Sequence, residues 1–287
     1  MMLPHCCVSA GLLFLSFAAI HGEELKDVEY GRAGKYSLRL DAQIPDGAGP
    51  FAAVILVHGG AWVAGDRTNN VQPLFQPLSD AGFAWFSISY RLAADVVRNP
   101  IGAALQLGGA ENDVRRAVAF VKEHASEYRV NPDKIALIGE SAGGQLASMA
   151  ALRPDPGGAV QGVVAFYTPS DLASLARTSS LIPDHVRDAV KGTPFDDILM
   201  AGLTEFSPIN YVSATSPPFL LIHGTDDNVV PFAQSERFCD KLRAAGVGCE
   251  LYRVEGGGHG MRAWQSLRLT DYKSSMVRWL RQVLAQR

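Results

Sequence analysis

The stretch Gly-Glu-Ser-Ala-Gly at residues 139–143 limits the possible folds of this chain more than any other. It follows the apolar residues 135–138, which predict a buried strand, and precedes residues 144–151, which predict a helix. The two glycines flank Ser141 at a distance of two positions, as a turn requires when only small residues fit beside the serine. A chance match in a loop is the alternative, but the flanking strand and helix favour a sharp turn that exposes the Ser141 hydroxyl.

The length and charge of the chain exclude several classes of protein. Its 287 residues are 47% hydrophobic and 19% charged, which is enough for one large core. The net charge of −3 argues against nucleic acid or an anionic membrane surface as a partner. No Cys or His spacing typical of a metal site occurs, so we expect no metal and no other cofactor.

Residues 1–22 have the pattern of a secretory signal peptide. Residues 8–20 are apolar but too few to span a bilayer, which needs roughly 20 apolar residues. The segment before them lacks Lys and Arg, so a buried N-terminal helix is the alternative. We expect cleavage after Gly22, a secreted or periplasmic protein, and a single domain over residues 23–287 without a membrane span.

The remaining chain alternates between strand and helix patterns. Apolar runs predict strands at residues 26–44, 51–57, 83–90, 135–138, 160–167, 219–222 and 249–254. Helical spacing or composition predicts helices at residues 71–82, 111–128, 144–151, 231–245 and 264–285. This alternation predicts an α/β fold with a mostly parallel sheet and helices on both faces. The first of these strands alternates and is expected at the antiparallel edge, whereas residues 91–109 give no clear pattern.

The connection formed by residues 168–216 is far longer than usual between a strand and the next. It contains Pro183, Pro194 and Pro208, with short helical segments between them. That is too little for a second domain. We therefore expect a small cap, or lid, over the strand ends, which is where ligands bind in such sheets.

A serine hydroxyl is a poor nucleophile, so Ser141 needs a base that takes its proton and an acid that orients the base. Of the seven histidines, His259 lies in a glycine-rich loop after the last predicted strand. The order serine, acid, histidine is the one that this motif predicts. Asp226 and Asp227 both follow the preceding strand, and spacing alone does not decide between them.

A second glycine-containing stretch, His58-Gly-Gly-Ala-Trp62, follows the strand predicted at residues 51–57. Its glycines allow the backbone to turn its N–H groups inward. We expect the N–H groups of Gly60 and Ala61, together with that of Ala142, to form an oxyanion hole for a tetrahedral intermediate. A plain turn at the end of a strand is the alternative.

Four aromatic residues are candidates for the substrate pocket, although aromatic side chains belong more often to the core. They are Trp62, Tyr167, Phe195 and Phe206.

Two cysteines remain after removal of the predicted signal peptide, Cys239 and Cys249. Cys239 lies in a predicted helix, and Cys249 opens a strand that runs back beneath that helix. The two Cα atoms can then approach within the roughly 7 Å that a disulfide requires. Export would let such a bond persist, so we predict a disulfide, with two separate buried thiols as the alternative.

The chain resembles α/β hydrolases, specifically the hormone-sensitive-lipase-like carboxylesterases and, within them, BD-FAE-type esterases, named for a bifunctional feruloyl and acetylxylan esterase. The resemblance rests on the stretches Leu38-Arg-Leu-Asp41, His58-Gly-Gly-Ala-Trp62, Gly65-Asp-Arg67, Ser89-Tyr-Arg-Leu92, Asn131-Pro-Asp-Lys-Ile135, Gly139-Glu-Ser-Ala-Gly-Gly144, Pro217-Pro-Phe-Leu-Leu-Ile-His-Gly224 and Gly257-Gly-His-Gly260. The family pattern His-Gly-x-x-Asp-x-x-Val-Pro aligns with the sequence from His223 to Pro231 and implies that Asp227 is the acid. Residues 93–109 depart from the family pattern.

This resemblance implies a secreted serine carboxylesterase that forms an acyl-enzyme on Ser141. It implies small acyl esters, acetyl or feruloyl, as substrates, either free or linked to plant polysaccharide. An arylformamidase-like amide hydrolase is an alternative, because such enzymes also carry a His-Gly-Gly-x-Trp stretch. A non-catalytic binding protein is a further alternative, because a fold does not fix a function.

Overall fold

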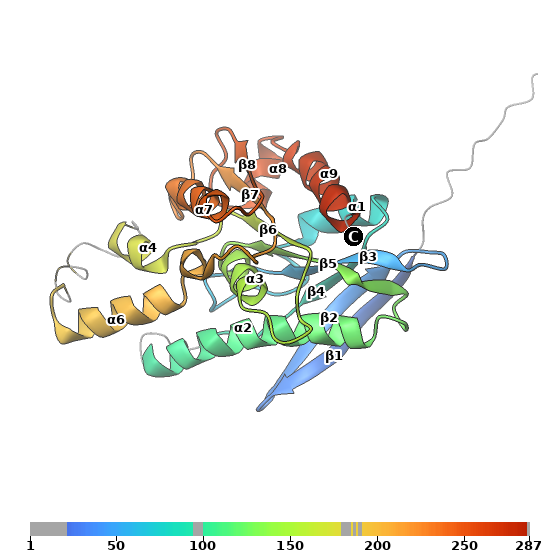
Figure 1. Cartoon of the computed structure of the whole chain (residues 1–287), viewed down its shortest axis with the longest axis horizontal. Coiled ribbons are helices and arrows are strands. Elements are labelled where there is room, and N and C mark those ends of the chain that lie inside the picture. The colour runs from blue at the N-terminus through green and yellow to red at the C-terminus, as the bar shows by residue number, and fades with distance from the viewer. Residues whose placement is uncertain (1–21, 94–99, 179–184, 186–187, 189–190, 286–287) are drawn as a thin grey trace, which may run out of the picture.

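The computed structural model describes residues 22–93, 100–178, 185, 188 and 191–285. The predicted signal peptide therefore lies outside the described residues, except for Gly22. The centre of the fold is an eight-stranded sheet with the order β1-β2-β4-β3-β5-β6-β7-β8 (Figure 1). Its strands are β1 (Glu23–Ala33), β2 (Tyr36–Ile44), β3 (Phe51–Val57), β4 (Ala84–Ile88), β5 (Val130–Glu140), β6 (Gly162–Phe166), β7 (Phe219–Gly224) and β8 (Cys249–Val254).

The sheet is mixed but mostly parallel, which confirms the predicted fold class. β1 pairs with β2 and β2 pairs with β4 in antiparallel fashion. All pairs from β4 through β3, β5, β6 and β7 to β8 are parallel. The carboxyl ends of β3, β5, β7 and β8 therefore lie at the same edge of the sheet, which is the edge where ligands bind in such folds.

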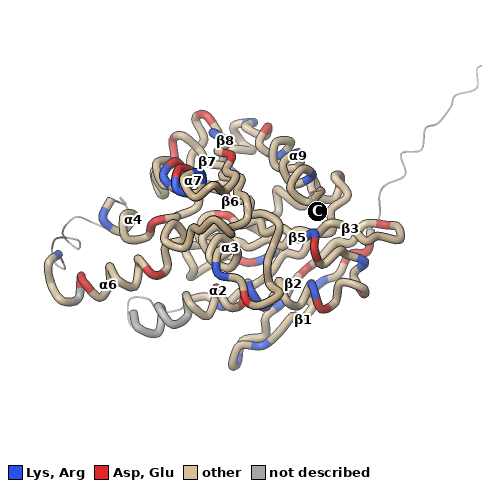
Figure 2. Tube along the Cα trace, in the orientation of Figure 1, with Lys and Arg blue, Asp and Glu red and all other residues tan. Residues whose placement is uncertain are grey.

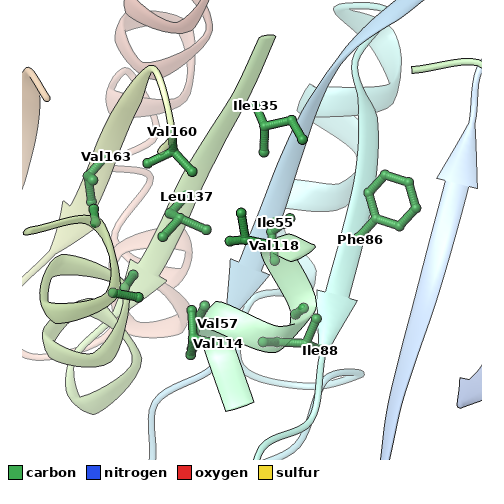
Figure 3. Packing of buried hydrophobic residues seen from close by; sticks show 14 of the residues in the cluster. Ile55, Val57, Phe86, Ile88, Val114, Val118, Ile135, Leu137, Val160 and Val163 are labelled. Carbon is green, nitrogen blue, oxygen red and sulfur yellow. The ribbon is translucent and has the colours of Figure 1, made fainter. Parts of the chain in front are cut away.

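Helices cover both faces of the sheet because successive side chains of a strand point in opposite directions. In β3, Ile55 and Val57 face one hydrophobic cluster, and Val54 and Leu56 face the other. The first cluster is covered by α2 (Pro100–Glu123), α3 (Ala142–Leu152) and α7 (Ala233–Ala244). The second is covered by α1 (Phe75–Asp80), α8 (Met261–Ser266) and α9 (Tyr272–Ala285), together with the 3-10 helix η1 (Gln72–Leu74). Figure 3 shows residues of the first cluster packed between the strands and α2.

The segment between β6 and β7, predicted as a cap, contains short helices, three of which have defined bounds. They are α4 (Leu172–Thr178), α6 (Pro194–Glu205) and the 3-10 helix η2 (Pro208–Tyr211). Figure 1 shows α4 and α6 projecting to one side of the sheet. Thr193 begins α6 as its N-cap, because its side chain accepts a hydrogen bond from the N–H of Asp196.

The prediction of a single strand at residues 26–44 is wrong, because the structure has two strands there, β1 and β2. β1 and β2 form an antiparallel hairpin that turns at Gly34, where φ is +59°. The alternating side chains that the sequence indicated, Leu38 and Leu40 among them, are buried in β2. β2 is therefore an inner strand, and β1 is the edge.

Two further expectations differ from the structure. Residues 100–109, which gave no pattern, belong to α2, and Pro100 occupies its first position, where the missing N–H of proline has no cost. Gly109 weakens the helical pattern, and a Cβ there would lie 2.6 Å from a guanidinium nitrogen of Arg91, so a larger residue would require the Arg91 side chain to shift. The helix predicted at residues 264–285 is interrupted, since α8 ends at Ser266 and α9 begins at Tyr272.

Acidic and basic residues are interspersed along the described chain (Figure 2), in keeping with its small net charge. Many form ion pairs, such as Arg91 with Asp113 at 2.6 Å and Arg67 with Asp41 at 2.9 Å. Among the described residues, no helix is long and apolar enough to cross a membrane.

Candidate active site

Ser141 lies at the sharp turn between β5 and α3. Its backbone has φ of 51° and ψ of −121°, an unusual conformation for a residue with a side chain. A Cβ on Gly139 would lie 2.3 Å from the carbonyl oxygen of Gly143, and a Cβ on Gly143 would lie 2.2 Å from that of His58. Only glycine fits at both positions, so these two residues permit the close backbone approach that the turn at Ser141 requires.

Ser141, His259 and Asp227 form one chain of hydrogen bonds. Oγ of Ser141 and Nε2 of His259 are 3.0 Å apart, and Nδ1 of His259 and Oδ2 of Asp227 are 2.7 Å apart. The three residues follow β5, β8 and β7, whose carboxyl ends share one edge of the sheet. Asp226, the other candidate acid, accepts a hydrogen bond from the Thr225 hydroxyl at 3.3 Å instead. The geometry thus selects Asp227.

The carboxylate of Asp227 is held by several donors. Its Oδ1 accepts hydrogen bonds from the N–H groups of Val229 and Val230, both at 2.9 Å. Burial raises the pKa of Asp227, but hydrogen bonds from His223 and His259 outweigh it and bring the pKa well below its usual range. Asp227 is therefore ionised at neutral pH and can stabilise a protonated His259.

His223 supports this carboxylate and was not assigned a role from the sequence. It is fully buried, and its Nε2 lies 2.9 Å from the carbonyl of Val230 and 3.3 Å from Oδ2 of Asp227. Two acceptors facing Nε2 place the proton there, so Nδ1 accepts from the Ser235 hydroxyl at 2.7 Å. His223 thereby fixes the loop that carries Asp227.

Glu140 and Tyr167 form a second buried hydrogen-bond network. The sequence did not predict that these two side chains pair. Oε1 of Glu140 accepts from the N–H of Gly59 at 2.8 Å, and Oε2 accepts from the Tyr167 hydroxyl at 2.6 Å. Burial first, and then the Glu140 carboxylate, hold the pKa of Tyr167 well above its usual range, so the phenol keeps its proton and donates it. The residue before the nucleophile is thus bonded to the strand end on each side of β5.

The predicted oxyanion donors lie on two segments near the nucleophile. Gly60 and Ala61 line the same cleft as Ser141, and Ala142 opens α3 directly after the serine. None of the hydrogen bonds between described residues uses the N–H of Gly60, Ala61 or Ala142 as its donor. These N–H groups are consequently free to stabilise an anionic oxygen.

Residues 59–62, named here the oxyanion loop, contain three successive residues with positive φ. The values are +113° at Gly60, +51° at Ala61 and +62° at Trp62. Such a conformation costs about 1–3 kcal/mol for each residue that has a side chain, so surrounding contacts must hold Ala61 and Trp62 in place.

A cleft of about 440 Å³ opens over the nucleophile. Its lining is Gly60, Ala61, Asn70, Glu140, Ser141, Tyr167, Val229, His259, Gly260, Met261, Arg262 and Ala263. Tyr167 thus lines the cleft as predicted, whereas Trp62 and Phe206 do not. Instead, Trp62 Nε1 donates to Gln145 Oε1 at 2.9 Å, and Gln145 Nε2 donates to the Phe206 carbonyl at 2.7 Å. The side chain of Phe195 lies outside the described residues.

A disulfide joins Cys239 of α7 to Cys249 of β8, with a Cα–Cα distance of 5.5 Å. Among the described residues, no cluster of His, Cys, Asp or Glu has the arrangement of a metal site. The groups around Ser141 are those that acyl transfer to a serine requires: a nucleophile, an oriented base and free N–H donors.

A match to a protein-family model shows the family to which this chain belongs. The BD-FAE family model matches residues 40–242. The chain belongs to the BD-FAE family. The resemblance inferred from the motifs is thereby confirmed, and the match runs from β2 through most of α7.

Relatives of this BD-FAE protein include two proteins of Mycobacterium tuberculosis. The probable carboxylic ester hydrolase LipM is 34% identical over 235 residues, which cover 78% of this chain and 52% of LipM. The esterase LipQ is 30% identical over 258 residues, which cover 83% of this chain and 57% of LipQ. The chain therefore spans about half the length of these relatives.

Solved structures share the fold. A truncated form of a carbohydrate esterase from gut microbiota superimposes with a TM-score of 0.72 at 26% identity, covering 93% of this chain and 98% of that one. The esterase Est2 of Thermogutta terrifontis superimposes with a TM-score of 0.67 at 24% identity, covering 88% of this chain and 91% of that one. The latter shows the fold alone.

Proposed function

We propose that this BD-FAE protein is a serine carboxylesterase that hydrolyses esters through an acyl-enzyme on Ser141. The observation that carries this proposal is the unbroken chain of hydrogen bonds from Ser141 through His259 to Asp227, beside a cleft. The family and its esterase relatives support the same reaction.

In the proposed reaction, each step is carried out by a named residue of the site. Oγ of Ser141 attacks the carbonyl carbon of the ester while Nε2 of His259 takes its proton. The carbonyl oxygen becomes an anion that receives hydrogen bonds from the oxyanion loop and from Ala142. The ester C–O bond then breaks, and His259 returns the proton to the leaving alcohol. Water attacks the acyl-enzyme by the same steps, releasing the carboxylic acid and restoring Ser141.

For the substrate we propose small acyl esters, acetyl or feruloyl, including those carried by plant polysaccharide. The structural relative described as a carbohydrate esterase supports this choice, as does the family to which the chain belongs. A cleft of about 440 Å³ falls within the range of small-molecule sites.

A panel of 4-nitrophenyl esters of rising acyl length, run beside acetylated xylan and methyl ferulate, tests this substrate class. We expect the highest kcat/KM with acetyl esters and release of acetate from xylan or ferulate from the methyl ester. Activity restricted to long acyl chains would contradict the proposed substrate, and no activity on any ester would contradict the enzyme.

We also propose that the protein is exported, with residues 1–22 as its signal peptide. The disulfide between Cys239 and Cys249 supports export, because such bonds persist in oxidising compartments. Expression of the full chain in a bacterium, followed by N-terminal sequencing of the periplasmic fraction, tests the proposal. Export with a new N-terminus near Glu23 is expected, and an uncleaved cytoplasmic protein would contradict it.

A further inference from the structure

The oxyanion loop has little internal support for its strained backbone. Within the turn, the carbonyl of Gly60 accepts from the N–H groups of Val63 and Ala64. Neither of these bonds involves the indole of Trp62, so contacts from outside the oxyanion loop must fix its position. A tight turn with side chains at positive φ keeps its shape only when neighbouring groups determine it.

Two of the supports come from the segment that carries the nucleophile. Glu140, directly before Ser141, accepts from the N–H of Gly59 at 2.8 Å. Gln145, four residues after Ser141, accepts from Trp62 Nε1 at 2.9 Å. The N–H of Gln145 in turn donates to the carbonyl of Ser141 at 3.1 Å, so the first turn of α3 fixes its position relative to the serine.

The same Gln145 side chain also reaches the cap. Its Nε2 donates at 2.7 Å to the carbonyl of Phe206, the C-cap residue directly after α6. An indole N–H can only donate and a carbonyl can only accept, so the orientation of the Gln145 amide is unambiguous. Gln145 is 2% exposed, and its amide oxygen and nitrogen are each paired with one of these groups.

The cap is itself anchored at this point. The next residue, Ser207, donates from its hydroxyl to the carbonyl of Leu203 at 2.7 Å and accepts from the N–H of Leu172 at 2.8 Å. The Phe206 carbonyl is therefore a fixed acceptor. Gln145 joins two fixed structures, α3 and the base of the cap, to the strained loop.

We propose that Gln145 is a positioning residue that holds the oxyanion loop in its catalytic conformation and sets that loop relative to the cap. Trp62 and Phe206, aromatic residues outside the cleft, act through this amide rather than by contact with substrate. This inference rests on the proposed esterase function. It implies that Gln145 affects the stabilisation of the tetrahedral intermediate more than the binding of substrate.

The test uses three variants. Gln145→Met keeps the approximate size of the side chain but removes both hydrogen bonds. Trp62→Phe removes the bond from the oxyanion loop to Gln145 and keeps the bond from Gln145 to Phe206, and the double variant combines the two changes. We expect Gln145→Met to lower kcat for 4-nitrophenyl acetate by about 10- to 100-fold, less than the loss of a whole oxyanion donor. KM should stay near its original value, and affinity for a trifluoromethyl ketone should fall by the same factor as kcat/KM. The double variant should be no worse than Gln145→Met, because the bond that Trp62→Phe removes, between Trp62 and Gln145, is already absent in Gln145→Met.

Gln234→Met is the matched control. Gln234 is 1% exposed and also anchors the cap, since its Oε1 accepts from the N–H of Asp171 at 2.8 Å. None of the hydrogen bonds that Gln234 forms with described residues involves the oxyanion loop. We expect Gln234→Met to reduce stability while kcat and ketone affinity stay close to wild type. An equal loss of ketone affinity in Gln234→Met and Gln145→Met would show a general effect of cap anchoring and overturn the proposal.

Unchanged kcat and ketone affinity in Gln145→Met would also overturn it, as would multiplicative losses in the double variant. If Gln145→Met does not fold, Trp62→Phe alone decides, because it should reproduce the loss of ketone affinity. Ser141→Ala distinguishes a failure of the proposed esterase mechanism from a failure of the role proposed for Gln145. Turnover in Ser141→Ala above a few per cent of wild type would contradict the esterase mechanism itself, because loss of a triad member usually costs several orders of magnitude. Turnover in Ser141→Ala below that threshold, beside a normal Gln145→Met, would contradict only the role of Gln145.

Discussion

The hydroxyl of Tyr167 donates a hydrogen bond of 2.6 Å to Oε2 of Glu140, the residue directly before the nucleophile. The same hydroxyl accepts from the N–H of Met261 at 3.2 Å, two residues after His259. The Tyr167 ring also meets the His259 ring edge-on, with centroids 4.7 Å apart. One phenol therefore connects the segment of the nucleophile to the loop of the base.

Replacing Tyr167 with Phe should reduce both stability and turnover. It removes the donor to Glu140 and leaves the buried N–H of Met261 without an acceptor. An unsatisfied buried group costs about 1–3 kcal/mol, so we expect the free energy of unfolding to fall by that amount, together with a lower kcat. Urea denaturation and turnover of 4-nitrophenyl acetate measure the two effects.

Tyr272→Phe is the matched control for this change. Tyr272 is 1% exposed like Tyr167, but its hydroxyl has no hydrogen-bond partner among the described residues. Its removal should leave the free energy of unfolding within about 0.5 kcal/mol of wild type, or raise it. A Tyr167→Phe protein no less stable than Tyr272→Phe would show that the network around Glu140 contributes nothing.

Asp227→Asn should be far more damaging than Asp226→Asn. An amide at position 227 cannot stabilise a protonated His259 and favours the wrong tautomer of its ring. The expected loss in kcat is about 10⁴-fold, as for other triads of this type. Asp226 has no contact with His259 among the described residues, so Asp226→Asn should stay within a few-fold of wild type. Comparable losses in the two variants would reassign the acid.

The stability of the protein should depend on Asp227 at low pH. Burial raises the pKa of this carboxyl, but the hydrogen bonds from His223 and His259 lower it well below the value of about 3.9 expected in the unfolded chain. A group with a lowered pKa in the folded state stabilises the fold above its unfolded pKa, and this contribution is lost as pH falls toward the folded pKa.

We therefore expect the free energy of unfolding of wild type to fall between about pH 5 and pH 3 by more than that of Asp227→Asn. Urea denaturation across this range measures the difference. Asp226→Asn removes the same charge next to it in the sequence and serves as the control, with the slope of wild type expected. Parallel slopes for wild type and Asp227→Asn would contradict the assigned pKa shift.

The disulfide should make a modest contribution to stability. Cys239 and Cys249 are separated by 10 positions, and closing so short a loop is expected to stabilise by about 2–3 kcal/mol on the chain-entropy model. The variant with both cysteines changed to Ser should lose about this much free energy of unfolding in urea, with kcat little changed. Two alkylated cysteines in the unreduced, exported wild-type protein would show that the bond does not form.

Local patterns explain which parts of the site were predictable from the sequence. The turn at Ser141 could be predicted from Gly139, Gly143 and the apolar residues 135–138, because the steric requirement lies within five residues. The order of Ser141, the acid and His259 follows from the order of the parallel strands. The choice of Asp227 over Asp226 needed either the family pattern or the structure, since both lie on one turn.

The supporting residues could not be predicted, because their partners are distant in the sequence. Gln145 meets Trp62 across 83 positions and Phe206 across 61, and such pairs depend on how α3, the oxyanion loop and the cap are placed. For the same reason, the prediction that Trp62 and Phe206 line the pocket rested on their aromatic character alone, and neither residue lines the cleft. The helix over residues 100–109 was missed because Gly108 and Gly109 weaken its pattern.

The central claim is that the acyl group of the substrate passes through a covalent bond to Ser141. Rapid acid quenching of the enzyme with excess 4-nitrophenyl acetate, followed by intact-mass and peptide analysis, tests it most directly. We predict a mass increase of one acetyl group, located on the peptide that contains Ser141 and absent from Ser141→Ala. An active enzyme that shows no acetylated species, or one acetylated at another residue during turnover, would contradict the account.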